Sequence, residues 1–304
     1  MMNAIGLTQP AYLSVEEKKL RICFKETGEV IYRPFYQLGY LLIDHPQITL
    51  SKSLLATLSA HNVALIVTNP QHMPVGMMLP LATHHMANFR FRAQLEAPLP
   101  LKKQLWKRFI KKKITNQAQM LQLHNKAIAA TKLRQLAQQV ISNDNTNRES
   151  AAATCYWKAL FGSQFVREQG RKGINGALNY GYAILRALMG RSLLRSGLLP
   201  IAGIHHHNRY NPYCLADDAM EPYRPFVDHV VYKKRDEISE EALSVGVKKQ
   251  LLNLFTQPCQ VPQGRGQLFH AIELTTASLA NCFETKKASP LQVYTFTPAP
   301  HAPS

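Results

Sequence analysis

Three consecutive histidines and several carboxylates are concentrated within residues 203–228 of this chain. The run His205, His206 and His207 is followed by Asp218 and Glu221. Magnesium and manganese prefer carboxylate oxygens with an occasional imidazole, and such ions stabilise the charge that develops when a phosphodiester is attacked. Because the chain carries a formal net charge of +17, these residues indicate a metal site that faces a polyanion. The chain is therefore a candidate enzyme acting on nucleic acid.

The spacing of these residues also allows a plainer interpretation. If residues 215–221 are helical, Asp218 and Glu221 share one face, and Pro222 ends the helix soon afterwards. A carboxylate pair of this kind is often only a solvated surface. Three adjacent histidines can likewise form a polar loop from which one or two side chains point inward. From spacing alone, both interpretations remain open.

Another acidic residue, Glu149, lies at the predicted start of a helix. Thr146 and Glu149 have the T-x-x-E spacing of a capping box, in which the glutamate accepts a hydrogen bond from a backbone amide. Taken alone, this spacing favours a structural role for Glu149.

The composition describes a basic globular protein. Lys and Arg number 36 against 19 Asp and Glu, so the surface should attract nucleic acid or an anionic membrane. No apolar run approaches the roughly 18 residues that a spanning helix needs, and the amino terminus does not resemble an export signal. Five scattered cysteines without a CxxC pair are typical of reduced thiols. We expect a cytoplasmic protein without a membrane anchor.

The pattern of apolar residues predicts an α+β fold in two domains. Period-two alternation predicts a small β-rich domain over residues 1–75, with a short helix at 51–60 that is capped by Ser51. Prolines and a glycine then suggest a linker over 76–85, and helical patterns predict an all-α domain over 86–288. The last segment, 289–304, has several prolines and no charged residue, which predicts a mobile tail.

One predicted helix, over residues 101–113, is both amphipathic and strongly basic. Its polar face is either an ordinary solvated surface or a contact with DNA phosphates, and such contacts carry no sequence information by themselves. The candidate DNA-binding residues are Lys107, Arg108, Lys111 and Lys112. A further helix, expected over residues 175–196, carries Tyr180, which could position a DNA end or simply belong to the core.

Four segments together resemble a known family. They are NRESAAATCYWKALFG, GINGALNYGYAILR, SGLLPIAGIHHHNRYNP and LADDAMEPYRPFVD. Their combination closely resembles the CRISPR-associated integrases of spacer acquisition, the family called Cas-one. The size of the chain and its Gly-Ile-His-His form are similar to the type II branch, and within it to II-C. The resemblance extends over about residues 10–285.

The resemblance implies a metal centre made of Glu149, His206 and Glu221, which would bind Mg²⁺ or Mn²⁺. It reverses the structural interpretation of Glu149. It selects His206 because the family histidine lies three residues after the glycine of a G-x-x-H motif, with His205 and His207 as second choices. Asp218 would be a supporting or alternative ligand.

The resemblance further implies an amino-terminal β-sandwich used for dimerisation and partner contact, followed by a helical catalytic domain. The implied assembly is a homodimer in a prokaryotic cytoplasm, with a small ferredoxin-like partner, Cas-two, and with a contribution from the RNA-guided effector nuclease. The implied reaction is transesterification, in which the 3′-hydroxyl of captured double-stranded DNA attacks a CRISPR repeat. Two other classes remain as alternatives: an HNH-like metal nuclease, suggested by His207 and Asn208, and a non-catalytic basic DNA-binding protein.

Overall fold

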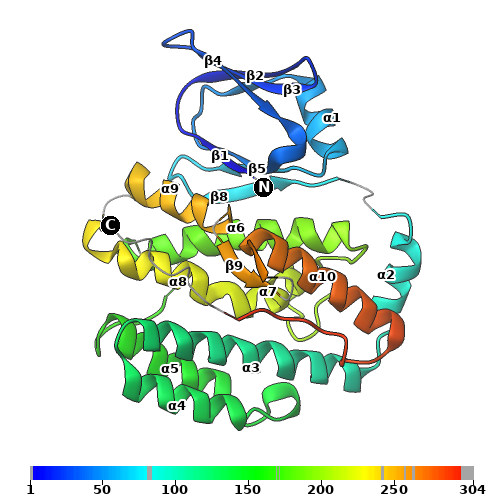
Figure 1. Ribbon diagram of the computed structural model, residues 1–304, viewed down its shortest axis with the longest axis vertical. Helices are drawn as coiled ribbons and strands as arrows, with labels where there is room; N and C mark the ends of the chain where they lie inside the picture. Colours follow the sequence, from blue (N-terminus) through cyan, green and yellow to red (C-terminus); the bar gives the residue numbers. More distant parts are fainter. Residues whose placement is uncertain are drawn as a thin grey trace. The chain divides into compact units, whose positions relative to one another are not determined.

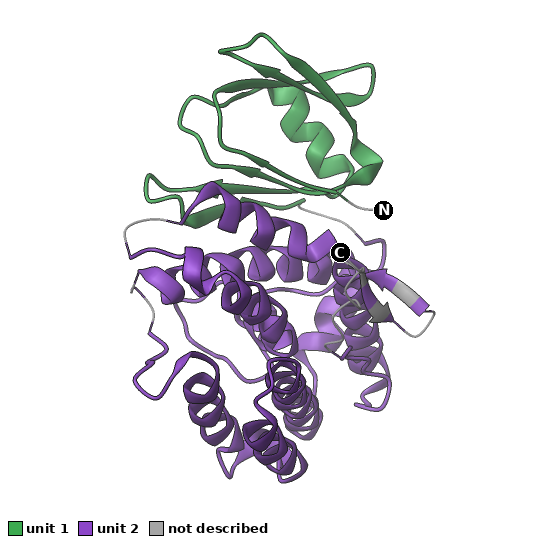
Figure 2. Cartoon of the chain, turned by 60° about the vertical axis from the view of Figure 1, so that its left-hand side comes forward, with its two compact units in different colours: residues 1–83 green, residues 84–304 purple. Residues whose placement is uncertain are grey.

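The chain folds into two compact units, residues 1–83 and 84–304 (Figure 2). The computed structural model describes residues 3–80, 84–168, 170, 172–240, 243–256, 258–261 and 264–295. Among these residues, no helix is long and apolar enough to cross a lipid bilayer.

The first unit contains two four-stranded sheets and one helix (Figure 1). One sheet has the order β4-β3-β2-β6 and the other β1-β5-β7-β8. Alternate residues such as Leu13, Leu20 and Ile22 are buried in the core that the sheets share with the helix, as the period-two pattern predicts. The elements are β1 (Asn3–Leu7), β2 (Ala11–Glu16), β3 (Lys19–Phe24), β4 (Val30–Pro34), η1 (Phe35–Gln37), β5 (Leu38–Ile43), β6 (Thr49–Leu50), α1 (Lys52–Ala60), β7 (Ala64–Thr68) and β8 (Pro74–Met78).

Helix α1 begins where its cap predicts. The Ser51 side chain accepts a hydrogen bond from the Leu54 amide at 3.2 Å, which satisfies a donor that has no partner within the helix. Leu54 and Leu58 are fully buried on its inner face.

The boundary of the first unit lies further along the chain than the sequence predicts. β8 pairs antiparallel with β7, so the predicted domain 1–75 is too short and the predicted linker 76–85 begins inside a strand. Pro74 is compatible with this strand because β8 is at the edge of its sheet, where a missing amide donor is tolerated. Residues 81–83 of the predicted linker lie outside the described residues.

The second unit is predominantly helical (Figure 1). Its helices are α2 (Ala87–Leu95), α3 (Leu99–Leu123), α4 (Ala127–Gln138), α5 (Arg148–Phe161), α6 (Gly173–Arg195), α7 (Cys214–Met220), α8 (Arg224–Lys233), α9 (Val245–Asn253) and α10 (Leu268–Thr285). Short 3₁₀ helices lie at η2 (Ser142–Asp144), η3 (Glu221–Tyr223), η4 (Arg235–Glu237) and η5 (Leu254–Thr256).

An antiparallel hairpin of β9 (Pro258–Val261) and β10 (Gly264–Gln267) interrupts these helices. The prediction of an all-α domain was therefore wrong in this part of the chain. Pro258 cannot continue the helical segment before it. Gly264 has a φ of +114°, a backbone conformation that favours glycine.

Helix α3 packs against α4, α5, α7, α8, η2 and η3, and Figure 1 shows it running alongside α4 and α5. Leu105, Phe109 and Ile110 are fully buried on its inner face, so the predicted amphipathic helix is present and extends beyond residues 101–113. The same face also carries Lys113, whose side chain is only 11% exposed.

Helix α6 corresponds to the helix predicted over residues 175–196. It ends at Arg195 with Ser196 as its C-cap, and the next residue, Gly197, has a φ of +71°. Left-handed residues of this kind commonly terminate helices.

Part of the predicted mobile tail is packed against the second unit. Leu291 and Tyr294 are buried, and the Tyr294 carbonyl accepts a hydrogen bond from Asn116 Nδ2 at 3.1 Å. The prediction was wrong for residues 289–295. Two buried apolar side chains, together with hydrogen bonds donated by side chains of α3 and α10, hold this segment in place although it has no charged residue. Residues 296–304 lie outside the described residues.

Candidate active site

Glu149 lies in the first turn of α5. Its backbone N–H and that of Arg148 each donate to a carboxylate oxygen of Asp144, at 2.9 Å in both cases. Asp144 therefore supplies the cap that the sequence assigned to a Thr146–Glu149 box. The Glu149 side chain faces α3 instead and accepts a hydrogen bond from Lys113 Nζ at 2.6 Å.

Glu221 begins η3, directly after α7, and its side chain is 4% exposed. Glu221 Oε2 lies 2.5 Å from Lys113 Nζ, and Oε1 lies 2.8 Å from Arg224 NH2. A single ammonium thus contacts both Glu149 and Glu221, although these residues are far apart in the sequence. The structure brings together the two glutamates that the family resemblance selects.

The electrostatics of this cluster favour the charged forms of Glu221 and Lys113. Burial tends to raise the pKa of Glu221, but Arg224 and Lys113 outweigh burial and lower it. Burial likewise opposes the charge on Lys113, but Glu221 and Glu149 raise its pKa. Cations beside carboxylates favour the ionised form of both partners.

Asp218 organises the histidine loop. It is fully buried in α7, where Oδ2 accepts from the amides of Ile204 at 2.6 Å and His205 at 2.9 Å. Oδ1 accepts from the His206 amide at 3.2 Å and lies 2.5 Å from His206 Nδ1. Because these contacts occupy both oxygens, the geometry favours a supporting role for Asp218 over a role as a direct metal ligand.

The contact with Asp218 also orients the ring of His206. A carboxylate that accepts a hydrogen bond from Nδ1–H leaves Nε2 as the ring nitrogen with a lone pair. The hydrogen bond to Asp218 raises the pKa of His206, while burial opposes this shift. Gly203 is required for this turn, because a Cβ there would lie 2.2 Å from the His206 carbonyl oxygen.

The three histidines occupy different environments. The His205 ring stacks on Trp106 of α3, with centroids 4.1 Å apart and an interplanar angle of 1°, whereas His206 meets Trp106 edge-on. Burial lowers the pKa of His205. All three residues are exposed on the loop. The contact of its Nδ1 with Asp218 distinguishes His206 from its neighbours, which spacing alone does not do.

The donor set fits a divalent cation only in part. Among the described residues, no three His, Cys, Asp or Glu side chains are close enough to hold one metal ion. Glu149 and Glu221 nevertheless share one positive group, the Lys113 ammonium. Two carboxylates that already hold a cation have the chemistry that a hard metal ion prefers.

The predicted DNA-binding residues have mixed outcomes. Arg108 and Lys111 of α3 are exposed, and Lys107 is half-buried. Lys112 donates to Thr295 Oγ1 at 2.9 Å, and burial lowers its pKa. Tyr180 is fully buried in α6, so of its two interpretations the structure supports the core residue and not the contact with a DNA end.

Sequence reasoning missed several residues that support the site, above all Lys113. A signal was present, because helical spacing places position 113 on the same face as Trp106, Phe109 and Ile110. Gln94 of α2 was also missed. Its buried amide donates to the carbonyls of Leu199 at 3.0 Å and Ala202 at 2.8 Å and thereby holds the segment before the histidine loop.

A buried polar cluster lies beside Arg224. The Asp228 carboxylate accepts hydrogen bonds from the hydroxyls of Tyr156, at 2.8 Å, and Tyr182. The Arg224 guanidinium lies over the Tyr182 ring, 4.8 Å from its centroid. Burial raises the pKa of Asp228 to about 6. These contacts connect the end of the LADDAMEPYRPFVD segment to the arginine that pairs with Glu221.

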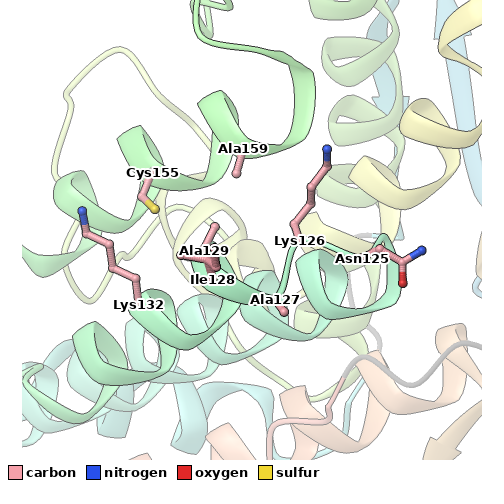
Figure 3. Close-up of a pocket in the computed structure, with 8 residues that line it drawn as sticks. All are labelled: Asn125, Lys126, Ala127, Ile128, Ala129, Lys132, Cys155 and Ala159. Atoms are coloured by element: carbon pink, nitrogen blue, oxygen red, sulfur yellow. The ribbon is translucent and has the colours of Figure 1, made fainter.

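A separate cavity of about 570 Å³ lies where the start of α4 faces α5 (Figure 3). Its lining is mainly apolar, with two lysines, and contains none of the predicted site residues. The lining residues are Asn125, Lys126, Ala127, Ile128, Ala129, Lys132, Cys155 and Ala159.

Two solved structures share the fold of this chain. A CAS1 protein from Thermotoga maritima matches with a TM-score of 0.73 and 16% identity, covering 98% of this chain and 100% of that one. A casposase bound to integration product matches with a TM-score of 0.72 and 20% identity, covering 94% and 91% of the two chains. At these identities the likeness establishes the fold alone, which is that of CAS1 proteins.

Sequence comparison identifies the family. The profile described as CRISPR associated protein Cas1 matches residues 6–253. The CRISPR-associated endonuclease Cas1 of Neisseria meningitidis is 34% identical over 282 residues, which cover 92% of each chain. A second relative, an endonuclease Cas1 of Pyrobaculum aerophilum, is 30% identical and covers 70% of this chain and 76% of its own length. The chain belongs to the Cas1 family, and the family predicted from the motifs is confirmed.

Proposed function

We propose that this protein is a metal-dependent DNA integrase and endonuclease that inserts captured DNA into a CRISPR array. The observation that carries the proposal is the convergence of Glu149 and Glu221 on one cation, next to a histidine held by Asp218. The matching relatives are named CRISPR-associated endonucleases. The casposase in its integration-product complex supports joining as well as cleavage.

Glu149, His206 and Glu221 are the proposed ligands of Mg²⁺ or Mn²⁺. When bound, the ion would polarise the attacked phosphate and help to ionise the attacking hydroxyl. Glu149 and Glu221 supply anionic oxygens from separate elements, and Asp218 keeps the proton on Nδ1 of His206. Arg224, whose side chain is 28% exposed, holds Glu221 in place through its other oxygen. The reaction is a transesterification, in which a DNA 3′-hydroxyl replaces the leaving oxygen of a repeat phosphodiester.

The proposed partners are double-stranded DNA, both as captured fragment and as CRISPR repeat, a second copy of this chain and a Cas2 protein. Two of the matching structures are Cas6-RT-Cas1–Cas2 complexes, and the formal charge of +17 suits a polyanionic substrate. We also propose a prokaryotic cytoplasmic location and, in acquisition, participation of an RNA-guided effector nuclease.

The two alternatives have less support. An HNH-like site needs strands around its histidine, whereas described residues 203–213 form turns and lead directly into α7. A non-catalytic binder would have no need for two carboxylates converging on a buried lysine, since burying charges is costly.

The proposal is tested by joining of a labelled duplex to a repeat-bearing plasmid in the presence of Mn²⁺ and a Cas2 partner. Joining should fall at least about 100-fold in each of three variants, Glu149→Gln, His206→Ala and Glu221→Gln. The matched control is His207→Ala, which changes an exposed side chain and should retain joining. Robust joining by the Glu221→Gln variant would refute the assignment. Cleavage without joining by the wild type would favour a hydrolytic nuclease, and DNA binding without either reaction would favour an architectural protein.

A further inference from the structure

Lys113 is an unusual residue for the inner face of a helix. Its side chain is 11% exposed and follows Phe109 and Ile110 along the buried face of α3. A buried ammonium is costly unless it is paired. Both of its described ion-pair partners are proposed metal ligands, Glu149 at 2.6 Å and Glu221 at 2.5 Å.

The charges of the cluster balance without a metal ion. Lys113 and Arg224 supply two positive charges, and Glu149 and Glu221 supply two negative charges. A divalent ion between the same carboxylates would add two positive charges and would need oxygens that already contact the ammonium. An ion and an ammonium that contact the same carboxylate oxygens lie close together, and two positive charges repel strongly in a low-dielectric site. The ion and the Lys113 ammonium therefore compete for the same ligands.

We propose that Lys113 is a resident counter-cation that holds Glu149 and Glu221 together in the metal-free protein and withdraws when a divalent ion binds. Lys113 thereby sets the ion concentration at which the site is loaded. A lysine suits this role because its charge is carried on a flexible four-carbon stem that can move without moving the helix. Arg224 remains on the other oxygen of Glu221. This inference rests on the proposed metal site.

The test is Mn²⁺ binding by the full chain without DNA, measured as loss of the electron paramagnetic resonance signal of free Mn²⁺. In Lys113→Met no ammonium competes with the ion for the two glutamates. Mn²⁺ should therefore bind this variant at least about tenfold more tightly than the wild type. Lys132→Met is the matched control, because it removes the same charge from an exposed position of α4; the Mn²⁺ affinity of this variant should stay within about twofold of the wild type. Equal or weaker binding by Lys113→Met would overturn the proposal.

A second measurement covers the case in which Lys113→Met is poorly folded. Without the ammonium, Glu149 and Glu221 repel each other, so the melting temperature in chelator should fall, and Mn²⁺ should raise it more in this variant than in the wild type. Lys113→Arg retains the charge and should keep the Mn²⁺ response of the wild type. A Mn²⁺ response in Lys113→Met no larger than in the wild type would contradict the competition. Because neither measurement involves DNA, a failure of joining does not affect its outcome.

Discussion

The position of His206 depends on one carboxylate, that of Asp218. This carboxylate accepts hydrogen bonds from three backbone amides of the histidine loop and contacts Nδ1 of His206. The neighbouring residue, Asp217, is also buried, but it pairs with Arg186 and Asn211 instead. Adjacent aspartates in one helix thus have separate tasks: Asp218 contacts the histidine directly, whereas Asp217 acts on it only through its charge.

Replacement of Asp218 by asparagine should therefore impair joining more than the same change at Asp217. An amide retains one acceptor oxygen but places an N–H₂ group where the loop amides or His206 need an acceptor. We expect Asp218→Asn to lower joining by about 10- to 100-fold, the usual effect of losing the group that orients a metal-binding histidine. Equal losses in Asp217→Asn and Asp218→Asn, measured in the plasmid-joining assay, would indicate damage to α7 in general.

Asp228 should make stability depend on pH. Burial raises its folded pKa to about 6, above the ordinary 3.8, so between these values the folded protein binds a proton that the unfolded chain has lost. The free energy of unfolding should therefore fall as pH rises from about 4 to 6, by about 3 kcal/mol. Urea unfolding across this pH range measures the free energy of unfolding. This free energy should fall with rising pH in the wild type relative to Asp228→Asn. Asp236→Asn, at a highly exposed position, is the control and should follow the wild type. A wild-type advantage that grows with pH would contradict the assignment.

At the level of single residues, the sequence allowed two interpretations and the structure separates them. The capping-box interpretation of Glu149 was wrong, because Asp144 of η2 makes the cap. For Tyr180 the sequence left a DNA contact and a core position open, because a helix pattern does not reveal which face a tyrosine occupies when α6 is buried on most sides.

At the scale of elements, the segment 289–295 links parts of the second unit that are distant in sequence. Asn116 of α3 donates both to the Tyr294 carbonyl and to the Pro222 carbonyl of η3, at 3.1 and 2.7 Å. Thr275 of α10 donates to the Gln292 carbonyl. The segment therefore lies against the elements that present Lys113 and Glu221.

Truncating the apolar anchor of this segment should destabilise the second unit. Leu291 is 8% exposed, and Leu291→Ala should lower the free energy of unfolding by about 2 kcal/mol through lost burial and a residual cavity. Ile128→Ala is the matched control, because Ile128 is 92% exposed and should change stability by less than about 0.5 kcal/mol. Equal denaturation midpoints for Leu291→Ala and the wild type would show that the segment contributes little.

Elements with strong periodicity were predicted well, whereas those defined by long-range pairing were not. α1 follows from its Ser51 cap, and α3 and α6 follow from their apolar spacing. β8 was assigned to a linker because its proline and glycine resemble a turn, and only pairing with β7 makes it a strand. The β9–β10 hairpin was missed for the same reason.

At the scale of the whole molecule, the formal charge of +17 contrasts with a site built around carboxylates. In the proposed function these two features have different roles. Basic side chains neutralise DNA phosphates wherever they lie and so raise the affinity for DNA, whereas the glutamates act only at the reaction site. Composition therefore favours a polyanionic partner. It could not locate the contact surface, since burial by the segment 289–295 removes part of the basic face of α3 from solvent.

The remaining part of that face is the better candidate for DNA contact. Lys107 and Lys111 are at least partly exposed and make no described ion pair, whereas Arg108 and Lys112 donate to the segment 289–295. If Lys107 and Lys111 contact phosphates, the variant with both changed to Gln should bind all duplexes more weakly. The slope of log affinity against log salt should then flatten by up to about 0.9 per lost contact.

Fluorescence anisotropy over a salt series measures both quantities. The control is Lys286→Gln with Lys287→Gln, a pair that lowers the net charge equally and lies just after α10. If α3 contacts phosphates, only the α3 variant should show a flatter slope of log affinity against log salt. Each phosphate that loses its contact keeps its condensed counterion when the protein binds. The same flattening in both variants would mean that the net charge of the molecule governs binding. An unchanged slope in the α3 variant would place the DNA path on another surface.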